Sequence, residues 1–113
     1  MSSTDKIWHY CGIESDFPKD GGAAVLIENK QIAIFNFDRR KEWYATDNEC
    51  PHKKQMILAR GMIGSEKGIP KVACPFHKRT FSLVDGKCLN DDTCQIDTYP
   101  IKVEENKIYI QLT

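Results

Sequence analysis

The sequence lacks the features of a membrane-anchored or secreted protein. None of its 113 residues lies in an apolar stretch approaching the roughly 20 residues that a membrane-spanning helix needs. The N-terminal segment MSSTDKIWHYCG also has no apolar core of the kind found in a signal peptide. We therefore expect a cytoplasmic protein with no membrane partner.

The chain has no excess of charge of either sign. Sixteen Lys and Arg residues balance sixteen Asp and Glu residues, so no overall field attracts nucleic acid or anionic lipid, and we expect no nucleic-acid partner. The hydrophobic fraction of 41% is ordinary for a soluble globular protein. The length suits one domain that spans residues 1–113.

Sustained helical periodicity is also missing, whereas runs of β-branched and aromatic residues recur. The segment 31–37 is apolar on both alternating faces, which predicts a strand covered on both sides. Turn residues at Asp85-Gly86 and Glu105-Asn106 predict two hairpins. We therefore predict an all-β domain, a small antiparallel sandwich or barrel. The clearest expected strands are QIAIFNF (31–37), EWYAT (42–46), TYPIKVE (98–104) and KIYIQLT (107–113).

Five cysteines is an odd number, which argues against a complete disulfide framework. Cys11, Cys88 and Cys94 have no nearby histidine and no ligand spacing, so we interpret them as core or surface thiols. The sequence leaves open whether Cys88 and Cys94 pair under oxidation. Each of the other two cysteines belongs to a short motif that also contains a histidine.

These motifs are Cys50-Pro51-His52 and Cys74-Pro75-Phe76-His77, separated by 21 residues. A Cys-x-His followed by a Cys-x-x-His is the ligand set of a Rieske [2Fe–2S] centre, in which two cysteines hold one iron and two histidines the other. Zinc accepts the same ligands, but zinc sites usually group like residues, whereas each motif here mixes one of each. We predict that Cys50, His52, Cys74 and His77 bind a [2Fe–2S] cluster, with a zinc site and a site without metal as the alternatives.

Two imidazoles in place of two thiolates make a cluster less negative, so it accepts an electron more readily. The reduction potentials of Rieske centres accordingly span about −150 to +300 mV. Neither motif is followed by a second cysteine for a loop disulfide, and Arg79 and Phe81 carry no hydroxyl. Fewer hydrogen bonds to the cluster sulfurs predict a potential in the lower part of that range. A basic rim of Lys53, Lys54, Lys78 and Arg79 either docks an acidic partner or is only a solvated surface.

Beyond the ligands, the chain resembles a Rieske-type ferredoxin domain from about residue 7 to its end. That resemblance implies a Rieske-like antiparallel β-sandwich or barrel with two cluster-binding loops. Its insert between the motifs makes the chain most similar to the small subunit of assimilatory NAD(P)H-dependent nitrite reductase. The resemblance rests on CPH (50–52), LARGMIG (58–64), CPFHKRTFSL (74–83), DGKCL (85–89) and YPIKVEENKIYIQL (99–112).

Membership of that family implies an electron-transfer subunit without catalytic residues of its own. The implied partner is a nitrite reductase large subunit with FAD, a [4Fe–4S] cluster and sirohaem, which reduces nitrite to ammonium. One alternative is a Rieske ferredoxin that feeds an oxygenase, although such ferredoxins usually have a shorter insert and a glycine where this chain has Lys78. A structural or regulatory subunit with a zinc or empty site is the other.

Overall fold

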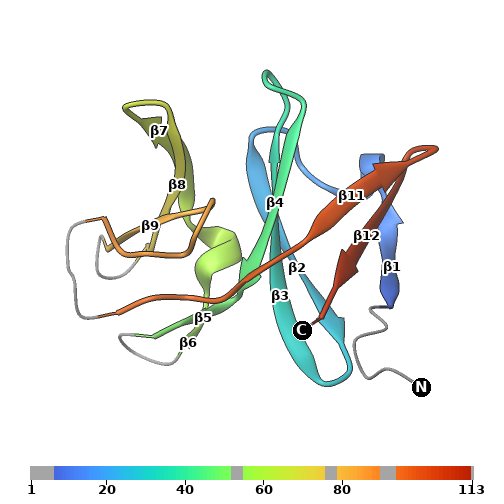
Figure 1. Cartoon of the computed structure of the whole chain (residues 1–113), viewed down its shortest axis with the longest axis horizontal. Helices are drawn as coiled ribbons and strands as arrows, with labels where there is room; N and C mark the ends of the chain where they lie inside the picture. The colour runs from blue at the N-terminus through green and yellow to red at the C-terminus, as the bar shows by residue number, and fades with distance from the viewer. Residues whose placement is uncertain (1–6, 52–54, 76–78, 90–93, 113) are drawn as a thin grey trace.

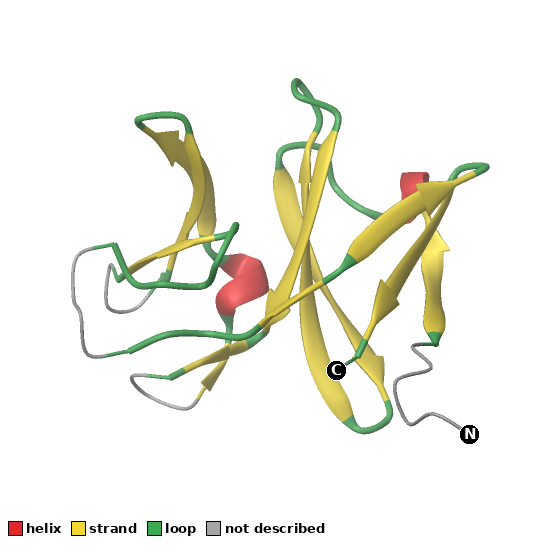
Figure 2. Cartoon of the chain, viewed as in Figure 1, coloured by secondary structure: helices red, strands yellow, loops and turns green. Residues whose placement is uncertain are grey.

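A computed structural model describes residues 7–51, 55–75, 79–89 and 94–112 (Figure 1). These residues form antiparallel strands in four small sheets and two single turns of 3₁₀ helix, η1 (Glu14–Asp16) and η2 (Leu58–Arg60), with no α-helix among them (Figure 2). The prediction of an all-β domain is therefore confirmed. No helix in this part of the chain is long and apolar enough to cross a membrane.

The strands divide between two parts of the molecule, which stand on opposite sides of the view in Figure 1. We call the part with sheets β1-β12-β11 and β10-β4-β3-β2 the base, and the part with sheets β5-β6 and β7-β8-β9 the loop-bearing part. The base contains β1 (Trp8–Ile13), β2 (Gly21–Ile27), β3 (Lys30–Phe37), β4 (Glu42–Asp47), β10 (Thr98–Tyr99), β11 (Ile101–Glu104) and β12 (Lys107–Gln111). The loop-bearing part contains β5 (Glu49–Cys50), β6 (Gln55–Met56), β7 (Met62–Glu66), β8 (Ile69–Ala73) and β9 (Thr80–Ser82).

Strand β3 lies between two hydrophobic cores. Its alternate residues Ala33, Phe35 and Phe37 belong to the core of the loop-bearing part. Ile32 and Ile34 belong to the core of the base. Every residue from 32 to 37 is buried, so the prediction of a strand covered on both faces is confirmed.

The expected terminal hairpin forms, but its first strand is shorter than predicted. Glu104 pairs with Lys107 around the turn. The single strand predicted for 98–104 is wrong, because the chain divides at Pro100 into β10, which pairs with β4, and β11, which pairs with β12. Proline has no backbone N–H to donate to a ladder, and its carbonyl accepts a hydrogen bond from Gln111 N at 3.0 Å.

The turn at Asp85-Gly86 is wider than the predicted two-residue hairpin. Ser82 N donates to Lys87 O at 2.8 Å, so four residues lie between the paired positions. Only Gly86 among those four has a positive φ, of 78°. The bridge between Phe81 and Cys88 continues the pairing on the next residues.

Candidate metal centre

Each sequence motif begins where four residues connect two paired backbone segments. In the first, Cys50 of β5 pairs with Gln55 of β6 and encloses residues 51–54. In the second, Cys74 follows β8 directly, and its N–H donates to Arg79 O at 2.8 Å across residues 75–78. Cys50 is the last residue of β5, so the first of the two expected cluster-binding loops begins on a strand.

The two thiols share one hydrophobic environment. Cys50 is 0% exposed and Cys74 is 2% exposed. Both belong to the core of the loop-bearing part, packed with Leu58, Val72 and Phe81. A thiolate buried among apolar groups is unfavourable unless a positive centre compensates its charge, and iron is such a centre. The buried cysteine pair therefore fits a metal held where the two sequence motifs begin.

The predicted histidine ligands His52 and His77 lie outside the described residues, as do Lys53, Lys54 and Lys78 of the basic rim. Among the residues that the structure describes, no group of three or more His, Cys, Asp and Glu side chains is arranged to hold a metal ion. The complete ligand set thus remains a prediction. Its two cysteine members lie in the same core.

Asn48 connects the start of the first motif to η2 and to β3. Its backbone carbonyl accepts hydrogen bonds from Ile57 N at 2.9 Å and Leu58 N at 3.0 Å. Its side-chain Oδ1 accepts from Ala59 N at 2.7 Å, and Nδ2 donates to Gln31 Oε1 at 3.0 Å. Because Asn48 is only 3% exposed and Ala59 is buried, the bond from Ala59 N is shielded from water, whereas the bond to the exposed Gln31 is only partly shielded. The side chain holds η2 and β3 against the strand that ends in Cys50.

Replacing Asn48 with alanine should lower the free energy of unfolding by about 2–3 kcal/mol, because the buried Ala59 N–H loses its acceptor. Urea unfolding followed by circular dichroism measures this change. Gln31→Ala is the matched control, since it removes only the exposed end of the same network, and it should cost about 1 kcal/mol or less. Equal losses for the two variants would contradict the assigned role of the buried bond.

Asp47, immediately before Asn48, joins the first motif to the C-terminal strands. Its carboxylate accepts hydrogen bonds from Tyr99 OH at 2.5 Å and from Asp97 N at 3.3 Å, and it lies 3.5 Å from Lys30 Nζ. Burial, followed by the hydrogen bond to Asp47, raises the pKa of Tyr99 to about 12. The phenol therefore remains a donor over the whole neutral range.

Sequence reasoning missed the structural role of the Asp47-Asn48 pair. The available signal was an acid and an amide directly before a predicted ligand. Side chains of both types often bond neighbouring backbone. Nothing in the sequence identified Ala59 or Tyr99 as the distant partners.

The remaining cysteines are thiols, as are Cys50 and Cys74. Cys88 is buried in the core of the loop-bearing part, and Cys94 packs against it. Cys11 packs against the core of the base instead. The interpretation of Cys88 as a core thiol is therefore confirmed.

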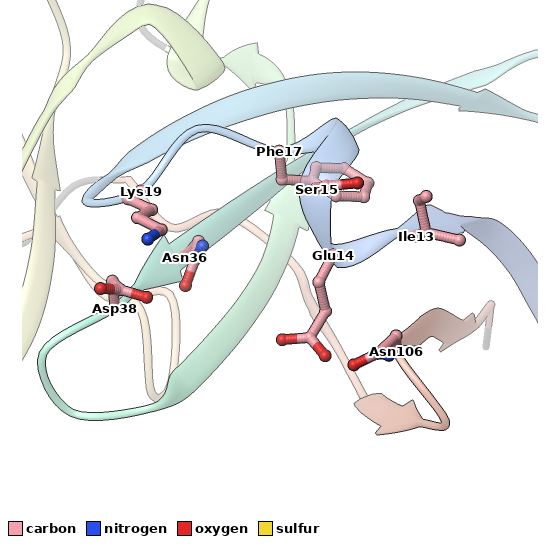
Figure 3. A pocket seen from close by; sticks show the side chains of 8 residues that line it. All are labelled: Ile13, Glu14, Ser15, Phe17, Lys19, Asn36, Asp38 and Asn106. Atoms are coloured by element: carbon pink, nitrogen blue, oxygen red, sulfur yellow. The ribbon is translucent and has the colours of Figure 1, made fainter.

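A separate hollow of about 650 Å³ opens on the base (Figure 3). Phe17 and Ile13 supply apolar walls, and the side chains of Glu14 and Asn106 lie near one another at one end of the view. Its lining comes from the end of β1, η1 and the segment that follows it, the end of β3 with the residue after it, and the β11–β12 turn. None of these residues belongs to the core that contains Cys50 and Cys74, so the hollow is distinct from the candidate metal centre.

Residues 7–111 match the family of Rieske-like [2Fe-2S] domains. The chain is 37% identical over 110 residues to the nitrite reductase [NAD(P)H] of Emericella nidulans; the match covers 88% of this chain but only 10% of that much longer protein. It is 30% identical over 101 residues to the nitrite reductase (NADH) small subunit of Escherichia coli, covering 89% of this chain and 93% of that one.

A ferredoxin component of an oxygenase system is also similar. The chain is 32% identical over 100 residues to the naphthalene 1,2-dioxygenase ferredoxin component of Pseudomonas putida, covering 88% of this chain and 89% of that one. Among solved structures, a protein described as an NADH-dependent nitrite reductase small subunit from Mycobacterium tuberculosis superimposes with a TM-score of 0.89. It is 27% identical, and the match covers 96% of each chain.

Proposed function

Since this chain belongs to the Rieske-like [2Fe-2S] family, we propose that it is the electron-transfer small subunit of a cytoplasmic nitrite reductase that uses NADH or NADPH. Cys50 and Cys74 would bind one iron of the cluster, and His52 and His77 the other. When bound, the cluster supplies one-electron transfer at a potential typical of Rieske centres. The observation that supports this role most directly is that the thiols of Cys50 and Cys74 are both buried in one core.

The protein residues contribute position and environment rather than bond-making chemistry. The paired backbone at Cys50 and Gln55, and at Cys74 and Arg79, fixes the position of each cysteine at the end of β5 and directly after β8. The apolar side chains around both thiols exclude water from the sulfur side of the site. Residues that hold ligands in place in this way tune both the affinity for metal and the reduction potential.

The proposed partner is the large subunit of the nitrite reductase, on which FAD, a [4Fe–4S] cluster and sirohaem would carry out the reduction of nitrite to ammonium. The similarity that spans 93% of the small subunit from Escherichia coli supports the role of a small subunit. The similarity to a tenth of the Emericella nidulans protein indicates that a related domain occurs within a longer reductase chain.

Spectroscopy of the full chain, purified without oxygen, tests the cofactor. We expect two irons per chain and, after reduction, the low average g-value of a Rieske centre in EPR. Cys74→Ser and His77→Ala should each lose that signal while circular dichroism still shows a folded β-domain, whereas Cys11→Ser should keep it. A colourless, EPR-silent protein with stoichiometric zinc would overturn the electron-transfer role.

Affinity purification from cells that use nitrite tests the partner. The tagged chain should retain a protein with the absorption spectrum of sirohaem, and addition of the purified chain should restore NAD(P)H-dependent nitrite reduction to a preparation lacking it. Recovery of a terminal oxygenase instead would support the ferredoxin alternative, for which the similarity to the naphthalene dioxygenase component is the favouring observation.

A further inference from the structure

A row of cross-strand neighbours in the loop-bearing part ends at a cysteine. Val72 of β8 pairs with Phe81 of β9, and Phe81 forms an antiparallel bridge with Cys88. Residues directly opposite one another on paired strands project to the same face. All three side chains accordingly belong to the core that also contains Cys50 and Cys74.

The register on the other side of Cys88 places Cys94 opposite it. Lys87 forms an antiparallel bridge with Gln95. In an antiparallel pair, one step forward on the first segment matches one step back on the second, so Cys88 is the counterpart of Cys94. The packing of Cys94 against the same core as Cys88 agrees with this register.

A second contact supports the same alignment. Ile96 N donates to Gly86 O at 2.9 Å, which is the pairing expected one step before the bridge between Lys87 and Gln95. Two consecutive positions thus share one register, and Cys88 with Cys94 is the next position in it.

This arrangement suits a disulfide. Directly opposite residues have Cα atoms about 4.5–5.5 Å apart and Cβ atoms about 4.5–5.5 Å apart. A disulfide needs Cα atoms about 4.4–6.8 Å apart and Cβ atoms about 3.5–4.5 Å apart. Only a small local adjustment separates the two geometries. We propose that Cys88 and Cys94 form a reversible intrachain disulfide, an oxidation site in the same core as the two candidate cysteine ligands.

The other cysteines are less suited to this reaction. Cys11 packs against the core of the base, whereas the pair belongs to the other core. Burial also raises the pKa of the Cys11 thiol, which lowers its fraction of reactive thiolate. Cys50 and Cys74 are the proposed iron ligands. Cys88 and Cys94 are therefore the two thiols that combine a facing position with no assigned ligand role.

Their unequal burial sets the order of the two steps. Cys94 is partly exposed, whereas Cys88 is 8% exposed. The Cys94 thiolate attacks one sulfur of a small-molecule disulfide such as oxidised glutathione; that S–S bond breaks, a mixed disulfide forms and one small thiol leaves. The Cys88 thiolate then attacks Cys94 Sγ and displaces the second small thiol. The protein thiols lose two electrons and two protons in total, and the oxidant gains both.

The sequence around the pair makes the product simple to detect. Trypsin cleavage after Lys87 and Lys102 releases both cysteines in one peptide, residues 88–102. The full-length chain is incubated with oxidised glutathione without oxygen, blocked with N-ethylmaleimide, digested and analysed by mass spectrometry. We expect this peptide to be lighter by two hydrogen atoms than its reduced, unalkylated form and to carry no N-ethylmaleimide. Reduction with dithiothreitol followed by fresh N-ethylmaleimide should convert it to the doubly alkylated form.

Three variants separate the outcomes. Cys88→Ser and Cys94→Ser should each abolish the internal cross-link. Cys88→Ser should leave Cys94 as a mixed disulfide with glutathione, whereas Cys94→Ser should leave the buried Cys88 as a thiol. Cys11→Ser should leave the cross-link unchanged. Glutathione buffers with increasing proportions of the oxidised form provide the test. If both cysteines of peptide 88–102 are still alkylated in fully oxidised glutathione, the proposal is refuted. A cross-link from Cys94 to Cys50 or Cys74 instead of Cys88 would refute it too. The peptide assay reads the thiols directly, so its result does not depend on the proposed nitrite reductase role.

Discussion

Gly86→Ala should lower the free energy of unfolding by about 3 kcal/mol or more, which is a large part of the roughly 5–15 kcal/mol typical of a whole domain. A Cβ at this position would lie 1.9 Å from the carbonyl oxygen of Ile96. The backbone also has a φ of +78°, which costs any residue with a side chain about 1–2 kcal/mol. The clash meets backbone rather than a flexible side chain, so neither segment relaxes without breaking its pairing.

Thermal unfolding measures this effect, with an expected decrease in Tm of about 10 °C or more for a domain of this size. Gly68→Ala is the matched control. Gly68 has a similar φ of +82°, but an added Cβ there meets nothing within 4 Å, so only the conformational cost of about 1–2 kcal/mol should appear. Similar losses for the two variants would show that the close approach to Ile96 is not what makes glycine necessary at position 86.

Gly61→Ala should lower the free energy of unfolding by about 2–3 kcal/mol or more, through a clash next to the start of the second motif. Gly61 has an ordinary φ of −71°, so space alone decides the outcome. An added Cβ would lie 2.3 Å from Ala73 O and 2.7 Å from Val72 Cγ2. Ala73 is the last residue of β8 before Cys74, so relief of this clash displaces the strand that presents a proposed iron ligand.

Two measurements on Gly61→Ala follow from this position: urea unfolding should show the loss of stability, and iron analysis of the anaerobically purified chain should show reduced occupancy. Gly64→Ala in neighbouring β7 is the control, because its added Cβ meets nothing within 4 Å, and both values should stay near those of the unchanged protein. Normal iron content in a strongly destabilised Gly61→Ala protein would mean that β8 moves without moving Cys74.

Local patterns in the sequence were sufficient to predict the elements whose burial they directly determine. The apolar run at 31–37 predicted a strand covered on both faces, and β3 is buried on both. The turn at Glu105-Asn106 was likewise found, since both residues adopt the positive φ that such a turn requires. The break at Pro100 was missed, because an alternating pattern does not reveal which of two sheets each half of a run will join.

The candidate site was predictable only in its ligand types. Spacing identified Cys50 and Cys74, and the structure brings both into one core. The hydrogen bonds from Ala59 N to Asn48 Oδ1 and from Tyr99 OH to Asp47 Oδ1 join residues 11 and 52 positions apart. No local pattern encodes contacts of that length. Likewise, the need for glycine at positions 61 and 86 arises from the backbones of Ala73 and Ile96, which approach only in the folded chain.

Strand β3 makes the two halves of the molecule thermodynamically inseparable. Its side chains alternate between the core of the base and the core that holds the two cysteine thiols. If β3 leaves one core, it also removes its side chains from the other. The domain should therefore unfold in one cooperative transition. Rieske-like domains built in this way would thus have no intermediate state in which the base is folded and the core around the two cysteine thiols is unfolded.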